Sequence, residues 1–117
     1  MGQQIPVYVF AGFLEAGKTK AIQETMEDPR FNDGERTLIL LCEEGVEEYD
    51  VSRFPGKNVF IEVVDNEENL TEDYMESLYE KYKIERVVVE YNGMWQFKSL
   101  FENLPQSWII YQFVLVK

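Results

Sequence analysis

Residues 5–19 read IPVYVFAGFLEAGKT, and two patterns meet in them. The apolar run over 5–11 is rich in β-branched and aromatic residues, which predicts a strand buried on both faces. Residues 12–19 fit G-x-x-x-x-G-K-[ST], the phosphate-binding loop, and a helical pattern follows over 18–26. A strand before this loop and a helix after it are the context that the motif requires. These residues therefore predict a strand–loop–helix unit that binds phosphates.

The chemistry of a triphosphate accounts for each position of this loop. Backbone N–H groups at a helix N-terminus cradle negative charge, and Gly12 and Gly17 supply backbone geometry and close approach that a side chain would block. We expect Lys18 to lie largely outside the core and to reach the β- and γ-phosphates, while Thr19 offers its hydroxyl to Mg²⁺. The alternative is a glycine-rich strand-to-helix turn with a surface lysine. The candidate nucleotide-binding residues of this segment are Gly12, Phe13, Leu14, Glu15, Ala16, Gly17, Lys18, Thr19 and Lys20.

The remaining chain alternates between strand and helix patterns. Apolar runs over 37–42, 59–64, 86–91 and 108–116 predict four further strands. Apolar residues at helical spacing predict helices over 70–82 and 97–104, the first of which begins at a loosened capping box of Asn69 and Glu72. This alternation predicts an α/β fold with a mostly parallel sheet of about five strands and helices on both faces. We expect a single nucleotide-binding domain of the P-loop type over residues 1–117.

A second group of candidate residues follows the strand over 86–91. Ligands of such sheets bind beyond the carboxyl ends of the strands, so segments 12–19, 43–50 and 90–93 are expected to converge. Glu90 ends its apolar strand in a carboxylate, which is typical of the group that holds Mg²⁺, directly or through water, or that positions the attacking water. Gly93 is placed to bring its backbone N–H to the γ-phosphate. The alternative is an ordinary acidic residue at the mouth of a strand.

These motifs resemble the CobW-type GTPases, the cobalamin-synthesis protein W family of metal chaperones, whose relatives serve hydrogenase and urease maturation. The opening over 6–19 is similar to the family pattern P-V-x-V-x-x-G-F-L-G-[AS]-G-K-T, and residues 87–93 are similar to its strand ending in E-T-x-G. Glu43, Gly45 and Asp50 match its N-E-x-G-x-x-x-x-D segment, with Cys42 in place of Asn. The resemblance implies Mg²⁺–GTP as the ligand, Glu43 and Asp50 as further candidate Mg²⁺ residues, and a client metalloprotein as partner.

The chain also departs from this family pattern. Residues 65–69 read DNEEN where the family carries a Gly-Cys-x-Cys-Cys metal motif, so delivery of a metal by thiolates is not implied. Glu15 replaces Gly and Lys20 replaces a second Thr within the phosphate loop. No N-K-x-D guanine-selecting motif occurs, which suggests that the 117 residues are the N-terminal portion of a longer domain.

Composition narrows the classes of partner and site. The net charge of −11 argues against nucleic acid and anionic membranes as main partners, because phosphate groups would be repelled. One cysteine and no histidine exclude a disulfide framework, a Cys/His zinc site and Ser–His catalysis. Cys42 is expected to be a small core residue at a strand end. No apolar run has the length of a membrane span and the first residues are not a secretory signal, so a cytoplasmic protein is expected.

Three hypotheses of function follow. The first is the nucleotide-binding domain of a CobW-like GTPase that hydrolyses GTP slowly in isolation. The second is a module of the same fold that has lost turnover and acts as a nucleotide-gated interaction domain, which the missing metal cysteines favour. The third is a structural α/β domain whose glycine loop is incidental. Turnover separates the first two, and Mg²⁺-dependent nucleotide binding separates both from the third.

Overall fold

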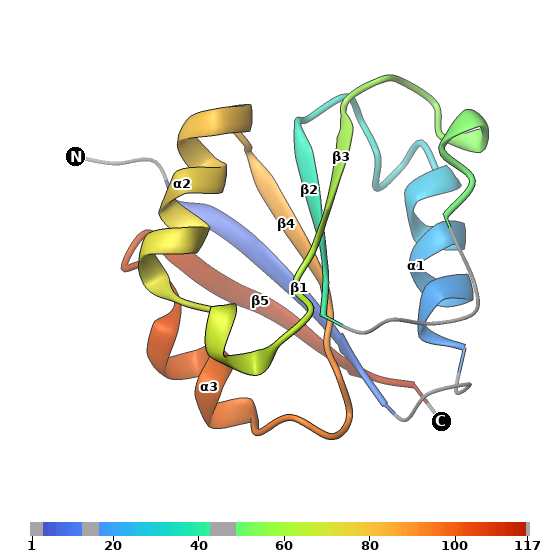
Figure 1. The fold of residues 1–117 in the computed structure, drawn as a ribbon. Coiled ribbons are helices and arrows are strands. Elements are labelled where there is room, and N and C mark those ends of the chain that lie inside the picture. Colours follow the sequence, from blue (N-terminus) through green and yellow to red (C-terminus); the bar gives the residue numbers. More distant parts are fainter. Residues whose placement is uncertain (1–3, 13–16, 43–48, 117) are drawn as a thin grey trace.

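Five parallel strands form one sheet at the centre of the molecule (Figure 1). The computed structural model describes residues 4–12, 17–42 and 49–116. The strands stand in the order β3-β2-β4-β1-β5, so β1 lies between β4 and β5. Every strand pair is parallel, which makes the sheet parallel throughout rather than mostly so. The strands are β1 (Ile5–Ala11), β2 (Thr37–Leu41), β3 (Val59–Val63), β4 (Arg86–Glu90) and β5 (Trp108–Leu115).

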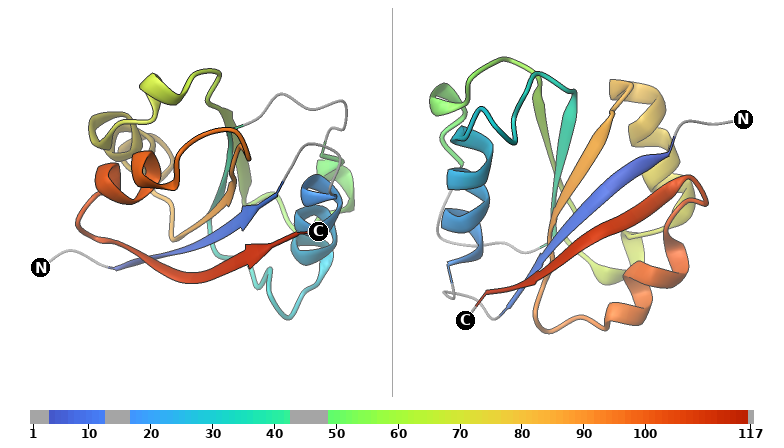
Figure 2. Two further views of the ribbon diagram at one scale, coloured as in Figure 1. Left: turned by 90° about the horizontal axis from the view of Figure 1, so that it is seen from below. Right: turned by 180° about the vertical axis from the view of Figure 1, so that it is seen from behind.

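Helices cover both faces of this sheet, as the sequence predicts. Helix α1 (Lys18–Glu27) lies on one face, and α2 (Glu72–Tyr82) and α3 (Phe97–Asn103) lie on the other, which Figure 2 shows from two further sides. Two short 3₁₀ helices, η1 (Val51–Arg53) and η2 (Glu67–Asn69), lie in the connections that flank β3.

The apolar strands divide their side chains between two cores. Alternate residues of a strand point to opposite faces, so a strand covered on both faces is apolar at nearly every position. Val7, Leu38 and Val87 pack in the core under α2 and α3. Ile39 and Val88 pack in the core under α1. This division explains why the strands read as continuous apolar runs instead of alternating ones.

The carboxyl ends of β1, β4 and β2 lie side by side because of their register. Phe10 pairs with Glu90, and Leu41 pairs with the same residue from the other side. The ladder continues beyond the strands, since Tyr91 N donates to Phe10 O at 2.9 Å and Cys42 N donates to Glu90 O at 2.9 Å. Cys42 is fully buried, which confirms its predicted place in the core.

The start of α2 corrects one prediction. Thr71, not Asn69, is the N-cap, and its hydroxyl accepts from Tyr74 N at 3.1 Å. Asn69 instead closes η2, which Asn66 caps by accepting from Glu68 N at 3.2 Å. The capping box of Asn69 and Glu72 is therefore wrong, because the extra 3₁₀ turn shifts the start of α2 by two residues.

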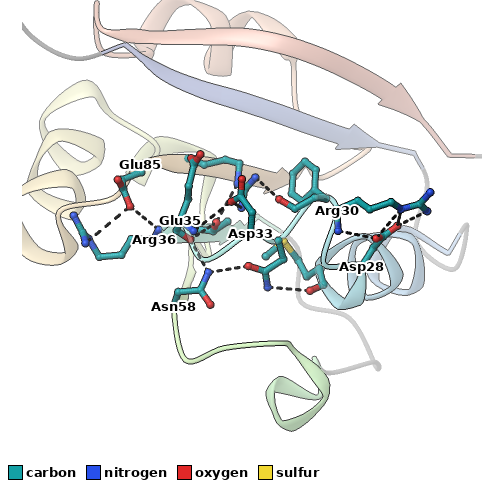
Figure 3. A network of polar contacts seen from close by, with 12 residues as sticks. Asp28, Arg30, Asp33, Glu35, Arg36, Asn58 and Glu85 are labelled. Atoms are coloured by element: carbon teal, nitrogen blue, oxygen red, sulfur yellow. Dashed lines mark hydrogen bonds and ion pairs between the residues drawn. The ribbon is translucent and has the colours of Figure 1, made fainter.

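The opposite end of the sheet is closed by a polar network (Figure 3). Arg36 N donates to Glu85 Oε1 at 2.9 Å, and Asn58 Nδ2 donates to Glu35 O at 2.6 Å. Arg86, only 5% exposed, donates to Phe31 O at 2.7 Å and to Thr37 Oγ1 at 3.1 Å. These contacts tie the amino ends of β2, β3 and β4 together and leave the carboxyl ends as the place where the loops gather.

Within the described residues, no helix has the length and apolar character needed to cross a lipid bilayer.

Candidate functional site

One glycine follows β1 and another precedes α1, and both have left-handed backbone geometry. Gly12 has φ +151° and Gly17 has φ +94°, values that side-chain-bearing residues rarely adopt. Nothing lies within 4 Å of a Cβ built on Gly17, so the backbone angle and not crowding calls for glycine there. Gly17 is the N-cap of α1 and makes no side-chain capping bond, while its carbonyl accepts from Ala21 N at 2.9 Å.

Lys18 is buried, which corrects the prediction that it lies largely outside the core. Its side chain is 3% exposed. Nζ donates to Gly12 O at 2.5 Å and to Tyr91 O at 3.2 Å. A buried ammonium requires such acceptors, because leaving water without them costs several kcal/mol. The side chain folds back between the ends of β1 and β4 and so ties the start of α1 to both strands.

Thr19 and Glu90 meet at the carboxyl end of the sheet, 71 residues apart in sequence. The Thr19 hydroxyl donates to Glu90, with its Oγ1 2.9 Å from Oε1 and 3.1 Å from Oε2. Glu90 is 2% exposed. The predicted convergence of segments 12–19 and 90–93 is confirmed at their described residues by this bond and by the Lys18–Tyr91 contact.

Tyr49 is a third member of the site that the sequence did not single out. Its hydroxyl donates to Glu90 Oε1, the same oxygen that accepts from Thr19. Burial raises the pKa of Tyr49 well above its usual value, and the nearby Glu90 charge adds to the shift. The phenol therefore stays protonated and remains a donor. Because a hydroxyl stabilises a carboxylate by donating to it, two donors offset part of the cost of burying Glu90.

The segment that carries Tyr49 is held against α1. The Gln23 side chain pairs with the Asp50 backbone twice, since Nε2 donates to Asp50 O and Asp50 N donates to Oε1, both at 3.0 Å. Phe54, four residues after Asp50, is buried in the core with Ile22 and Met26 of α1. Helix α1 thus carries Thr19 at its start and the anchor of Tyr49 one turn later.

The remaining predicted residues are placed as follows. Lys20 is exposed on α1, and Gly93 is half-buried in the turn after β4. Asp50 is exposed, and its carboxylate caps η1 by accepting from Ser52 N at 3.2 Å. Among the described residues, none of these three makes a polar contact with the Thr19 hydroxyl or the Glu90 carboxylate. Outside the described residues lie Phe13, Leu14, Glu15, Ala16 and Glu43.

Carboxylate and hydroxyl oxygens make up the donor set of this site. In the described part of the chain, no group of three or more His, Cys, Asp or Glu side chains is arranged to hold a metal ion. Thr19 and Glu90 are oxygen donors in contact, which suits a hard cation that keeps several waters and shares its ligands with a phosphate. Thr19 and Glu90 therefore offer oxygen ligands of the kind that a hard cation prefers, rather than the soft ligands that favour several transition metals.

Comparison with protein-family models, with curated proteins and with solved structures finds no match to this chain.

Proposed function

We propose that this chain is a P-loop nucleotide-binding domain that takes up Mg²⁺ and GTP at residues 12–20 and hydrolyses the nucleotide slowly. The observation that carries the proposal is the hydrogen bond from Thr19 Oγ1 to Glu90, at 2.9 and 3.1 Å. It joins the hydroxyl of the G-x-x-x-x-G-K-[ST] motif to the carboxylate at the end of the neighbouring strand. The position of the motif between β1 and α1 and the resemblance to CobW-type GTPases support the same proposal.

The Thr19 hydroxyl is oriented by this bond for metal binding. A hydroxyl has one proton and two lone pairs, and donating the proton to Glu90 leaves both lone pairs to accept or coordinate. Glu90 adds a negative charge beside them in a poorly solvated place, where charges interact more strongly than in water. Bound Mg²⁺ would neutralise part of the triphosphate charge. Thr19 and Glu90 are the residues that would hold it.

Lys18 supplies the second positive charge of the proposed site. Its ammonium lies between Gly12 O and Tyr91 O at the carboxyl ends of β1 and β4. Phosphate oxygens are stronger acceptors than carbonyls, and a charge-assisted hydrogen bond contributes roughly 1.5–3 kcal/mol. Exchange of a carbonyl partner for a phosphate oxygen is therefore favourable. The first turn of α1, whose N-cap is Gly17, would offer backbone N–H groups to the same phosphates.

Glu90 is the residue proposed to act in hydrolysis. It would orient a water for attack on the γ-phosphorus, with cleavage of the bond to the oxygen bridging the β- and γ-phosphates. Its carboxylate is already engaged by Thr19 and Tyr49, so it acts mainly by position. We propose a slow rate of hydrolysis because positioning and charge stabilisation carry phosphoryl transfer. Lys18 is the cationic side chain that we assign to stabilising the charge of the transition state.

The test compares two threonines of α1. Thr19→Val removes the proposed ligand, and Thr25→Val is the matched control, since the Thr25 hydroxyl donates to Ala21 O within the helix. We expect Thr19→Val to weaken Mg²⁺–GTP binding by about tenfold or more, because a polar contact to a charged group contributes roughly 1.5–3 kcal/mol, and Thr25→Val to leave the affinity unchanged. Equal affinities for both variants would contradict the proposal.

Phosphate release from GTP tests the second half of the proposal. Release that is lost in Glu90→Gln supports a GTPase. Mg²⁺-dependent binding without release instead identifies the nucleotide-gated interaction module described above.

A further inference from the structure

We infer that Tyr49 is a positioning residue for the proposed Mg²⁺ site, and that it makes Mg²⁺ affinity depend on the docking of residues 49–54 against α1. This inference rests on the proposed function. The Tyr49 hydroxyl donates to Glu90 Oε1, which also accepts from Thr19 Oγ1 at 2.9 Å. The hydroxyls of Thr19 and Tyr49, which lie in different segments of the chain, thus both donate to Glu90 Oε1 and hold it in position.

Fixing Glu90 matters because a glutamate side chain has several rotatable bonds. Its side-chain entropy is worth up to about 2 kcal/mol, which a metal must overcome if the carboxylate is free to turn. Thr19 holds the carboxylate from the side of the phosphate loop, and Tyr49 holds it from the side of the connection after β2. Partners that orient a metal ligand in this way typically change metal affinity by about 10- to 100-fold when they are removed.

The backbone of the Tyr49 segment has its own anchors on α1. Gln23 pairs with both backbone groups of Asp50 at 3.0 Å. Arg53 Nε lies 3.3 Å from Glu27 Oε2, and Phe54 is 7% exposed against the α1 core. The hydroxyl of Tyr49 is therefore placed by contacts that lie outside the phosphate loop. Release of this segment from α1 would remove the Tyr49 hydroxyl from Glu90.

The experiment uses Tyr49→Phe, which removes only the hydroxyl, and Tyr111→Phe as the control, because Tyr111 is 63% exposed on β5. GTP affinity is measured for the intact chain in excess Mg²⁺ and in excess EDTA. We expect Tyr49→Phe to reduce the gain in affinity due to Mg²⁺ by about tenfold, at unchanged affinity in EDTA. Tyr111→Phe should match the wild type under both conditions. Circular dichroism confirms that each variant is folded.

Two further variants show whether the effect passes through Glu90. In a Glu90→Gln background, Tyr49→Phe should cause no additional loss, since the two residues act as a unit. Gln23→Ala leaves residue Tyr49 unchanged but removes the hydrogen bonds that hold the neighbouring Asp50 backbone against α1. It should therefore reproduce part of the loss in Mg²⁺ dependence. If Tyr49→Phe fails to fold, the Mg²⁺ dependence of GTP affinity in Gln23→Ala tests the inference instead, and a value equal to that of the wild type would overturn it.

The possible results separate this inference from the proposed function. A Tyr49→Phe chain that equals Tyr111→Phe overturns the inference alone, and so does an equal loss with and without Mg²⁺, which indicates a general structural role. A wild-type chain whose GTP affinity does not depend on Mg²⁺ overturns the proposed function and the inference with it.

Discussion

Replacement of Lys18 by methionine should destabilise the fold as well as weaken nucleotide binding. The sequence predicts a lysine outside the core, whose loss would spare the fold, whereas the structure buries its ammonium at 3% exposure. Methionine keeps most of the aliphatic stem but removes the two hydrogen bonds to Gly12 O and Tyr91 O. A hydrogen bond from a charged group contributes roughly 1.5–3 kcal/mol, and relief of the buried charge offsets part of the loss. We expect a net decrease of about 2 kcal/mol in the free energy of unfolding.

The assay is urea or thermal unfolding followed by circular dichroism, with Lys20→Met as the control. Lys20 is exposed two residues further along α1, so its loss should change stability by no more than about 0.5 kcal/mol. A decrease of about 2 kcal/mol corresponds to roughly 8 °C in Tm for a chain of 117 residues. If Lys18→Met and Lys20→Met unfold at the same point, the hydrogen-bonded position of Lys18 between β1 and β4 is refuted.

Three further predictions concern the base, the cysteine and the sheet edge. The affinities for GTP and ATP should lie within about tenfold of each other, or about 1.4 kcal/mol, because every proposed contact is made to the phosphates. Calorimetric titration with both nucleotides tests this, and a hundredfold preference for GTP would show that this chain recognises the base. Burial raises the pKa of Cys42 from 9.0 to about 12, so the folded chain should resist thiol reagents at pH 8, and urea should restore the reaction. The free energy of unfolding, measured by urea denaturation, should fall as pH rises from about 9 towards 12, because the unfolded chain loses this proton first. Strand β5 forms an edge with Phe113 41% and Leu115 58% exposed, and no charged residue occurs over 103–116, so sedimentation should detect self-association that Phe113→Lys reduces.

The sequence predicted most of the secondary structure because burial on both faces leaves a strong signal. All five strands and three helices lie where their apolar patterns place them, and their ends differ from the predicted ones by at most two residues. For example, the strand predicted over 37–42 ends at Leu41, and Cys42 continues the ladder by one hydrogen bond. The order of the strands in the sheet, unlike their positions in the sequence, could not be predicted from apolar patterns. Nothing in the local pattern states that β4 lies between β2 and β1, and this order brings Glu90 beside Thr19.

The candidate site was predictable only where a motif fixes the residue type. Thr19 and Glu90 follow from the loop motif and from the acid that ends an apolar strand. Tyr49 was missed because a tyrosine among acidic loop residues has no local periodicity, and its role depends on Gln23 of α1 holding the backbone next to it. The burial of Lys18 was missed because its acceptors are carbonyls at the ends of two strands, which a side-chain motif does not reveal.

Calorimetric titration of the chain with Mg²⁺–GTP and with Mg²⁺–GMP tests the central claim most directly. Lys18, the α1 N-terminus and the Thr19–Glu90 pair are all assigned to the phosphates, and GMP lacks the β- and γ-phosphates that Lys18 and Mg²⁺ would address. We predict saturable binding of GTP and an affinity for GMP that is about a hundredfold weaker or more, the equivalent of losing about 2.7 kcal/mol. Equal binding of GTP and GMP, or binding of neither, would contradict the account.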